Sequence, residues 1–361
     1  MRQNLAILFG GKAAEYPISL LSASNVISSC RQLADYQLFL IGISKEGIFY
    51  EYVGPDEAIA TDNWHRKSEW LRPIVFQPHL QSGYWRQEQD QSWTPVSLDL
   101  VFPVLHGQDG EGGPLQGFLE TLGLSYVGCG QLAAALLMDK VFANQIFEQR
   151  GFRQAAFTSL KAGELAADPD LAQRLIIEAG IDYPLFVKPA NTGSSFGISK
   201  VMTEAELDAA LELAMRYDEK ILIEQGIMGR ELEVAVLERE DGSVVASLAG
   251  EIIPGKEFYD YQDKYAADSA SSICIPAALS DGQMEEIRNI AVEAFKCCDC
   301  RGLARVDFFL READQLIYIN EINTMPGFTA ISMYPKLWQA AGLPPKELMA
   351  ELLRTAEIKR T

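Results

Sequence analysis

The chain has 361 residues, enough for two or three domains, and its 48% hydrophobic content supplies several cores with apolar side chains. A formal net charge of -19 repels polyanions and no run of Lys and Arg offsets it, so we expect no nucleic-acid partner. No uninterrupted apolar run of about 18 residues occurs, and residues 5–9 resemble a strand more than a leader, so we expect a cytoplasmic protein without a membrane partner.

The first 128 residues alternate strand-like and helical stretches, which is the pattern of a parallel α/β layer. The strand-like runs are "LAILF", "YQLFLIGIS", "LDLVFPVLH" and "LSYVG", at residues 5–9, 36–44, 98–106 and 124–128. The polar segment at residues 81–97 is predicted to form a surface hairpin or loop. Residues 10–25, "GGKAAEYPISLLSASN", place a glycine pair between the first strand and a helix.

Two common nucleotide-binding patterns, the P-loop and the dinucleotide fingerprint, find little or no match in this sequence. The P-loop pattern GxxxxGK[ST] is absent, because "GGKA" and "PGKE" lack the upstream glycine spacing and the following hydroxyl. The segment "GCGQLA" at residues 128–133 partly matches the dinucleotide fingerprint between a strand and a helix. A nicotinamide-dependent oxidoreductase is therefore a weak alternative, and the glycine pair near the N-terminus lacks this spacing as well.

The central part of the chain contains a loop suited to phosphate. A helix is predicted over residues 131–151, followed by a strand, a glycine-containing loop and a strand over 184–201, and then by a helix at 204–217. In the loop, Lys188 ends a strand that a proline helps to stop, and two serines follow Gly193. Small residues let backbone N–H groups approach an anion, and a lysine adds a point charge. An ordinary turn with a solvated lysine is the alternative.

The last third of the chain is predicted to contain strands near residues 221–237, 244–253, 303–310 and 316–322, followed by helices. Alternation in "GLARVDFFL" puts Arg305 and Asp307 on one face and turns the other face to the core, through Ala304, Val306, Phe308 and Leu310. The same rule groups four residues of the next strand, namely Ile317, Ile319, Glu321 and Asn323.

A hairpin between these two strands gathers hard oxygen ligands. Pairing Leu310 with Leu316 places Arg305 opposite Glu321, and Asp307 opposite Ile319. The oxygens of Asp307, Glu321 and Asn323 then lie close together beside an arginine. Such hard oxygen ligands suit Mg2+, which takes water and phosphate oxygens at its other positions. The following turn, "TMPGF", offers backbone N–H groups to an oxyanion. A salt-bridged sheet face is the alternative.

The cysteines of "KCCDCRG" have a structural interpretation. No second pair of Cys or His lies at a ligand-like spacing, which disfavours a metal site. Cys298 instead continues the helical stripe of Ile287, Ala291 and Ala294, and Gly302 can end that helix. We therefore expect reduced thiols.

Several long motifs, in order along the whole chain, resemble the D-alanine:D-alanine ligases of the ATP-grasp superfamily. They are "GGKAAEYPISLLS", "LHGQDGEGGPLQGFLE", "YVGCG", "MDK", "FVKPANTGSSFGISKV", "IEQGIMGRELEVAV", "FYDYQDKY", "ARVDFFL" and "INEINTMPGFTAISMYPKLW". The resemblance implies an α/β (α+β) fold of three domains: an N-terminal parallel α/β domain (1–128), a central domain (129–223) and a C-terminal domain (224–361). It also implies ATP bound between the last two domains, cytoplasmic synthesis of the peptidoglycan precursor D-alanyl-D-alanine, and a homodimer.

The resemblance also implies the residues that bind the nucleotide and its metal. Those expected to contact ATP phosphates, or the phosphoryl group in transfer, are Lys140, Lys188, Ser195 and Lys264. Those expected around the adenine are Glu224 at its amino group, Gln225, Ile227 at the base edge, and Phe258 and Phe309 as apolar walls. Glu231 is expected on the ribose hydroxyls. Two Mg2+ ions, or Mn2+, are expected on Asp307, Glu321 and Asn323.

The family pattern likewise implies how the amino-acid substrates bind. The trio expected to orient the first D-alanine and to hold down a mobile loop is Glu15, Ser194 and Tyr265. The oxyanion donors are expected to be Arg305 and the Gly327 N–H. The other residues expected near the substrates are His106, Ser332 and Met333. As an alternative role, His106 and Glu111 brace the turn from strand to helix.

One departure from the family pattern concerns Tyr16, which stands where a histidine usually follows the glutamate. We expect it to alter the affinity of the first D-alanine site, with Ser19 and Ser22 capping or buttressing the adjoining helix. Retention of Lys264 and Tyr265 favours the dipeptide product. The alternatives are a ligase that uses D-lactate or D-serine as second substrate, and a catalytically silent ATP-binding module.

Overall fold

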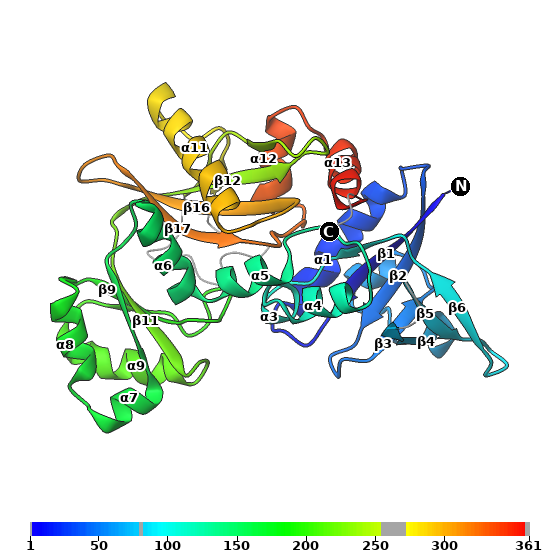
Figure 1. Ribbon diagram of the computed structural model, residues 1–361, viewed down its shortest axis with the longest axis horizontal. Coiled ribbons are helices and arrows are strands. Elements are labelled where there is room, and N and C mark those ends of the chain that lie inside the picture. Colours follow the sequence, from blue (N-terminus) through cyan, green and yellow to red (C-terminus); the bar gives the residue numbers. More distant parts are fainter. Residues whose placement is uncertain (1, 79–81, 254–271, 358–361) are drawn as a thin grey trace.

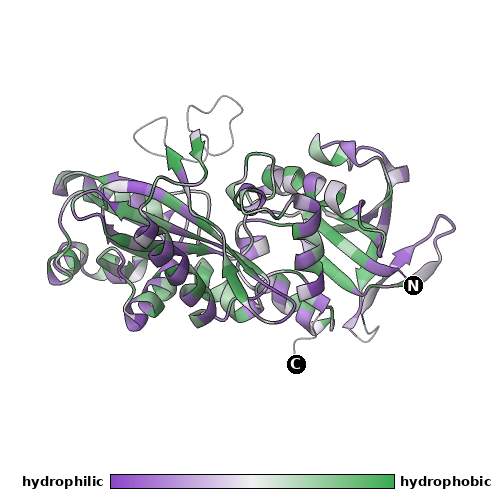
Figure 2. Cartoon of the chain, turned by 90° about the horizontal axis from the view of Figure 1, so that it is seen from above, coloured by the Kyte–Doolittle hydropathy of each residue, from purple (hydrophilic) through white to green (hydrophobic). Residues whose placement is uncertain are grey.

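The computed structural model describes residues 2–78, 82–253 and 272–357, which form three β-sheets with helices packed against them (Figure 1). Hydrophobic residues are concentrated on the strands and the inner sides of the helices, while hydrophilic residues cover the outer surfaces (Figure 2). In the described part of the chain, no helix has the length and apolar character needed to cross a membrane.

The first sheet lies in the N-terminal third of the chain. Its strands, in the order β6-β5-β4-β3-β2-β1-β7, are β1 (Gln3–Gly10), β2 (Tyr36–Ile43), β3 (Phe49–Tyr52), β4 (Leu71–Phe76), β5 (Gly83–Gln87), β6 (Trp93–Ser97) and β7 (Leu100–Pro103). The helices are α1 (Tyr16–Cys30), α2 (Glu57–Ala60), the 3-10 helix η1 (Ser68–Trp70), α3 (Gln108–Glu111) and α4 (Pro114–Thr121).

This first sheet is mixed, whereas the sequence predicted a parallel layer. β1 pairs in parallel with β2 and β7, but β2 to β6 pair antiparallel, because each follows its neighbour without a crossover helix long enough for parallel pairing. The hairpin predicted at 81–97 is confirmed as β5 and β6. The strand predicted at 124–128 is reduced to a single parallel bridge between Val101 and Tyr126.

The second sheet is antiparallel and belongs to the central part of the chain. Its strands, in the order β10-β9-β11-β8, are β8 (Phe157–Lys161), β9 (Leu185–Pro189), β10 (Ser199–Val201) and β11 (Lys220–Gln225). The nearby helices are α5 (Gln131–Met138), α6 (Lys140–Arg150), α7 (Ala162–Ala167), α8 (Leu171–Glu178), the 3-10 helix η3 (Glu204–Glu206) and α9 (Leu207–Met215). The helix predicted at 204–217 is thus confirmed as η3 and α9.

The single helix predicted over residues 131–151 is wrong, because Asp139 divides it into α5 and α6. Asp139 has an extended backbone, with ψ 101°, and its side chain accepts hydrogen bonds from the N–H groups of Val141 and Phe142. It therefore caps a new helix, which starts at Lys140. The break holds Lys140 beside the loop after β9, where its N–H donates to the carbonyl oxygen of Ala190.

The third sheet is antiparallel and occupies the last third of the chain. Its strands, in the order β15-β14-β12-β16-β17 with β13 also paired to β12, are β12 (Gly229–Glu238), β13 (Val244–Ala246), β14 (Gly250–Ile253), β15 (Ser272–Cys274), β16 (Leu303–Arg311) and β17 (Ile317–Asn323). Its helices are α11 (Asp281–Cys297), α12 (Met333–Ala340) and α13 (Pro345–Glu357).

The pairing of β16 with β17 corrects the predicted register. Leu310 lies opposite Ile317 instead of Leu316, and Arg305 lies opposite Asn323 instead of Glu321. The register also shifts between Asp307 and Phe308, so the pairs here are Asp307 with Glu321 and Phe308 with Ile319. Asn320 is thus the extra residue of a bulge, a device that re-aims side chains.

The bulge also changes which residues of β17 share a face. Ile317 and Ile319 pack in the core with Ile322, so the predicted grouping of the two isoleucines with Glu321 and Asn323 is wrong. On β16 the expected core face is confirmed, with Ala304, Val306, Phe308 and Leu310 all buried in the same cluster.

One hydrophobic core joins the first and third sheets. In it, α1 packs against α13, so the first and last helices of the chain lie side by side (Figure 1). The N-terminal residues in this core include Leu20 and Phe102, and the C-terminal ones include Tyr334 and Leu352. The second sheet has a separate core with α8 and α9. The domain limits at 128 and 223 stay predictions.

Candidate active site

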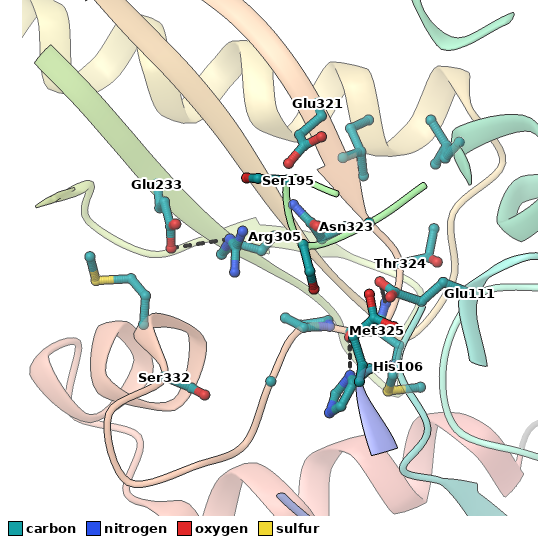
Figure 3. A pocket seen from close by; sticks show the side chains of 18 of the residues that line it. His106, Glu111, Ser195, Glu233, Arg305, Glu321, Asn323, Thr324, Met325 and Ser332 are labelled. Atoms are coloured by element: carbon teal, nitrogen blue, oxygen red, sulfur yellow. Dashed lines mark hydrogen bonds and ion pairs between the residues drawn. The ribbon is translucent and has the colours of Figure 1, made fainter. Parts of the chain in front are cut away.

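Two adjoining pockets lie where the three sheets meet, and the described residues predicted for the site line them. The first pocket is lined by residues from all three parts of the chain, including Glu15, His106, Ser194, Arg305, Asn323, Gly327, Ser332 and Met333 (Figure 3). The second pocket is lined by Lys188, Glu224, Gln225, Ile227, Glu231, Asp307 and Phe309, among others. Both pockets share Lys140, Ser195, Glu233 and Glu321. Phe258, Lys264 and Tyr265 lie outside the described residues.

Glycines make room for Glu15 at the edge of the first pocket. The buried Glu15 directly precedes α1. A Cβ atom on Gly107 would lie 2.4 Å from its Oε2, and one on Gly193 would lie 3.1 Å from its Oε1. The loop of Gly193 also holds Ser194 and Ser195 in the left-handed region, at φ 53° and 60°, a conformation that costs energy in non-glycine residues. The backbone is therefore shaped to bring this loop against the carboxylate.

Two partly buried lysines connect the loop after β9 to the second pocket. The Nζ of Lys140 donates to the carbonyl oxygen of Thr192 at 2.6 Å, and burial lowers its pKa. Lys188 forms an ion pair with Glu224, whose other oxygen accepts from the Nδ2 of Asn144 at 2.7 Å. Burial acts to lower the pKa of Lys188, but Glu224, together with Glu321 and Glu231, raises this pKa above its ordinary value. Two cations and the Glu224 carboxylate thus line the second pocket, together with Lys200 and further carboxylates.

Asn144 was missed in the sequence, although a signal existed. It lies four residues after Lys140 on α6, so both side chains leave the same face of the helix. Gln225, in turn, uses its side chain to brace a turn, because its Oε1 accepts from the Asp182 N–H at 2.6 Å.

Arg305 is partly buried and held by two carboxylates. Its Nε and one terminal nitrogen donate to the two oxygens of Asp307, at 2.7 and 2.6 Å, and its Nε lies 3.1 Å from the Oε2 of Glu233 (Figure 3). Burial acts to lower the pKa of Arg305, but Asp307 and Glu233 raise it well above its ordinary value. Arg305 is therefore a permanent positive charge. Glu233 was also missed, although it shares a strand face with Glu231.

The oxygens near Arg305 fit a hard divalent cation. Asp307 and Glu321 face each other across β16 and β17, and the Nδ2 of Asn323 donates to Asp307 at 2.9 Å, which leaves the Asn323 Oδ1 to face a cation. Carboxylate and amide oxygens are the ligands that Mg2+ and Mn2+ take. Within residues 2–78, 82–253 and 272–357, no cluster of three His, Cys, Asp or Glu side chains is arranged to hold a metal, so the amide is a necessary part of this set.

His106 and Glu111 both brace the first pocket and line it. The Nδ1 of His106 lies 3.1 Å from the carbonyl oxygen of Met325, and its Nε2 lies 3.0 Å from the Ser22 hydroxyl. Burial lowers the pKa of His106 to about 4. Glu111 accepts from the Gly107 N–H at 2.9 Å, and burial raises its pKa to about 7. Both hold the turn after β7 against the turn after β17.

Tyr16 directly follows Glu15, which lines the first pocket, but is not itself among the described residues that line it. Its contacts indicate a structural role, and the effect on substrate affinity expected from the sequence stays a prediction. Its ring is buried in the core that joins the first and third sheets. Its hydroxyl donates to the Oδ1 of Asp62 at 2.7 Å and accepts from the Nε1 of Trp64 at 3.0 Å. Ser19 and Ser22 buttress α1 through their hydroxyls and do not cap it, since Ser19 bonds the Gly10 N–H and Ser22 the Phe328 N–H.

The cysteines behave as structural residues. All six carry free thiols, and Cys298 is buried beside Ala291 and Ala294 in one core, as the helical stripe predicted.

Comparison with known proteins assigns the chain to a family. Residues 4–129 match the family described as D-ala D-ala ligase N-terminus, and residues 146–354 match D-ala D-ala ligase C-terminus. The chain belongs to the D-alanine–D-alanine ligase family. It is 42% identical to the D-alanine–D-alanine ligase of Thermoanaerobacter sp. strain X514, over 98% of this chain and 96% of that protein.

Solved structures agree with the ligase family over the whole fold. The VanG D-Ala:D-Ser ligase of Enterococcus faecalis has a TM-score of 0.88 and 36% identity, covering 99% of this chain and 100% of that one. The D-alanine-D-alanine ligase of Coxiella burnetii has a TM-score of 0.84 and 34% identity, covering 99% and 94%. The mixed α/β architecture with several sheets is therefore the ATP-grasp fold of these ligases.

Replacing Tyr16 with phenylalanine is expected to lower stability and leave substrate binding unchanged. The variant leaves the buried Trp64 N–H without its acceptor, which costs about 1 to 2 kcal/mol of unfolding free energy. Urea unfolding measures the loss, and the KM for D-alanine measures substrate binding. A variant with unchanged stability and an altered KM contradicts this role.

Replacing His106 with asparagine is expected to remove the contribution that makes the protein more stable as pH rises from about 4 to 6.5. Between about pH 4 and 6.5 the unfolded chain binds a proton that folded His106 excludes, so its contribution to stability falls by about 1.4 kcal/mol per unit as pH falls. Glu111 has a raised pKa and acts in the opposite direction, so the variant is compared with the wild type at each pH by urea unfolding. Equal slopes in both proteins contradict the prediction, and the exposed His65→Asn is the matched control.

Proposed function

We propose that this protein is an ATP-dependent ligase that joins two D-alanine molecules into D-alanyl-D-alanine, a peptidoglycan precursor. The observation that carries the proposal is the junction of the two pockets. A pocket with two partly buried lysines and an apolar wall opens, at Lys140, Ser195 and Glu321, into a pocket with a carboxylate at one side and an arginine at the other. A phosphate donor and an amino acid are thereby placed next to each other.

ATP fits the second pocket through the chemistry of its lining. Lys140 and Lys188 neutralise phosphate charge, Glu224 accepts from the adenine amino group, and Glu231 accepts from the ribose hydroxyls. Phe309, directly across the strand pair from Glu231, provides an apolar surface for the base. Asn144 keeps Glu224 oriented and is added to the residues that serve the nucleotide.

Asp307, Glu321 and Asn323 are the residues that would hold Mg2+ or Mn2+ ions, two in the proposed arrangement. When bound, these ions supply charge neutralisation to the transferring phosphoryl group. Lys140 and Arg305 are cations that line the first pocket together with Glu321 and Asn323. They reinforce that neutralisation from the start of α6 and from β16.

The first pocket is arranged for an amino acid with its carboxylate toward the nucleotide. We assign Glu15 to the substrate ammonium, with Ser194 beside it. The carboxylate of the first D-alanine attacks the γ-phosphorus of ATP, ADP leaves, and D-alanyl phosphate results. The amine of the second D-alanine then attacks the acyl carbon and releases phosphate. Arg305 and the Gly327 N–H stabilise the oxyanion of this second step, where one donor is worth about 3 to 4 kcal/mol.

The second substrate is D-alanine in this proposal, and D-serine is the alternative that a specific observation favours. VanG, which superposes over the whole chain, is described as a D-Ala:D-Ser ligase. Met333, an apolar residue of the first pocket, is better suited to the methyl group of D-alanine than to a hydroxyl. We also propose a cytoplasmic location, where ATP and free thiols are found, and a homodimer as in the family pattern.

The test is an assay of the purified protein with ATP, Mg2+ and D-alanine. Phosphate and D-alanyl-D-alanine are expected in equal amounts, and D-serine or D-lactate in competition should yield less mixed product. Asp307→Asn should lose activity, while Asp314→Asn, in the exposed turn of the same hairpin, should retain it. Nucleotide binding without phosphate release would contradict the proposal, and a preference for D-serine would move it to the alternative acceptor.

A further inference from the structure

Glu233 stands in a row of three acidic residues that crosses the third sheet at the junction of the two pockets. Strand pairing places Glu233 on β12 opposite Asp307 on β16, and Asp307 opposite Glu321 on β17. Glu233 and Asp307 are buried, and Glu233 lines both pockets. Like charges directly opposite each other destabilise a sheet, so this row requires cations.

Arg305 supplies one such cation from β16, two residues before Asp307 on the same strand. It lies between Ala235 and Asn323 of the neighbouring strands and reaches back toward the row. Its fork holds both oxygens of Asp307, while a longer contact of 3.1 Å joins its Nε to Glu233 (Figure 3). The arginine is thus shared unequally between two carboxylates.

This arrangement conflicts with cation binding at Asp307. A two-point bond to guanidinium takes one lone pair on each oxygen of Asp307 and holds a positive charge beside the place of a divalent ion, so the two cations repel each other. If Asp307 changes partner, the partly buried Arg305 needs another carboxylate, since an unpaired charge that is largely removed from water is unfavourable. Glu233 is already within ion-pair distance and approaches from the opposite strand.

We propose that Glu233 is a positioning residue that takes over Arg305 when Asp307 binds a divalent cation. Arg305 then stays in the first pocket, turned from Asp307 toward the substrates, and Asp307 is released for the metal. The inference rests on the proposed function, because it takes Asp307 as a cation ligand. It assigns to Glu233 a role in metal binding without direct contact between Glu233 and the metal.

The test measures Mn2+ binding to the ADP-saturated protein, with free Mn2+ followed by electron paramagnetic resonance and Mn2+–ADP binding subtracted from a protein-free titration. Glu233→Gln should weaken Mn2+ binding about tenfold, because Arg305 remains on Asp307. Glu233→Asp should weaken Mn2+ binding similarly, because the shorter side chain keeps its charge but places the carboxylate farther from Arg305. Thermal unfolding of each variant checks that the fold is retained, and the aspartate variant serves if the glutamine variant does not fold.

The decisive experiment makes the Glu233→Gln substitution in a protein that lacks the Arg305 guanidinium. In an Arg305→Met background Asp307 is already released, so adding Glu233→Gln should change Mn2+ affinity less than about twofold. An equal loss in both backgrounds would show that Glu233 acts on the metal directly or through packing, and would overturn the inference. So would unchanged Mn2+ affinity in Glu233→Gln or in Glu233→Asp.

Two controls separate this inference from the function on which it rests. Asp307→Asn should abolish the Mn2+ site, and if it does not, the proposed metal role itself fails. Glu251→Gln removes a carboxylate from the neighbouring strand β14, where it forms a two-point pair with Arg230. This matched variant should bind Mn2+ as the wild type does. Loss of binding in Asp307→Asn with normal binding in Glu233→Gln overturns the role of Glu233 alone.

Discussion

The Arg305 guanidinium offsets the repulsion among three acidic side chains that face one another across β12, β16 and β17. Without this cation, the buried Glu233 and Asp307 would carry like charges at cross-strand distance in a poorly solvated place. The bulge at Asn320 belongs to the same arrangement, because it turns Glu321 and Asn323 to the side of Arg305 and leaves Ile322 in the core. The charged centre and the irregular strand therefore depend on each other.

The remaining parts of the site are brought to this centre by packing between distant segments. The shared core of α1, α12 and α13 fixes the first sheet against the third, and so sets Glu15 and His106 beside the turn after β17. The Ser22 hydroxyl reinforces this contact by bonding both His106 and the Phe328 N–H. The loop after β9 in the second sheet packs against Glu15 at Gly193. The same loop accepts a hydrogen bond from the Lys140 Nζ at the carbonyl oxygen of Thr192.

Local patterns were enough to predict which segments carry the site, but not how those segments fit together. Alternation on β16 correctly separated Arg305 and Asp307 from the core residues, because a strand with one buried face leaves that signal in its sequence. The bulge in β17 leaves no such signal, so the register was wrong by up to two residues. The sequence around Asp139 likewise predicts a continuous helix, because the hydrogen bonds by which Asp139 caps α6 are evident only in the structure. The contacts of Tyr16 could not be predicted, because its partners, Asp62 and Trp64, are distant in sequence and carry no recognisable motif.

The central claim is that the carboxylate of one D-alanine is activated by phosphorylation where the two pockets join. The most direct measurement uses D-alanine with 18O in both carboxylate oxygens and determines the label in the products by mass spectrometry. One labelled oxygen should appear in each phosphate released, and the other should remain in the amide carbonyl of the dipeptide, because the oxygen that attacks phosphorus leaves with it. Phosphate without label, released together with dipeptide, would contradict the account.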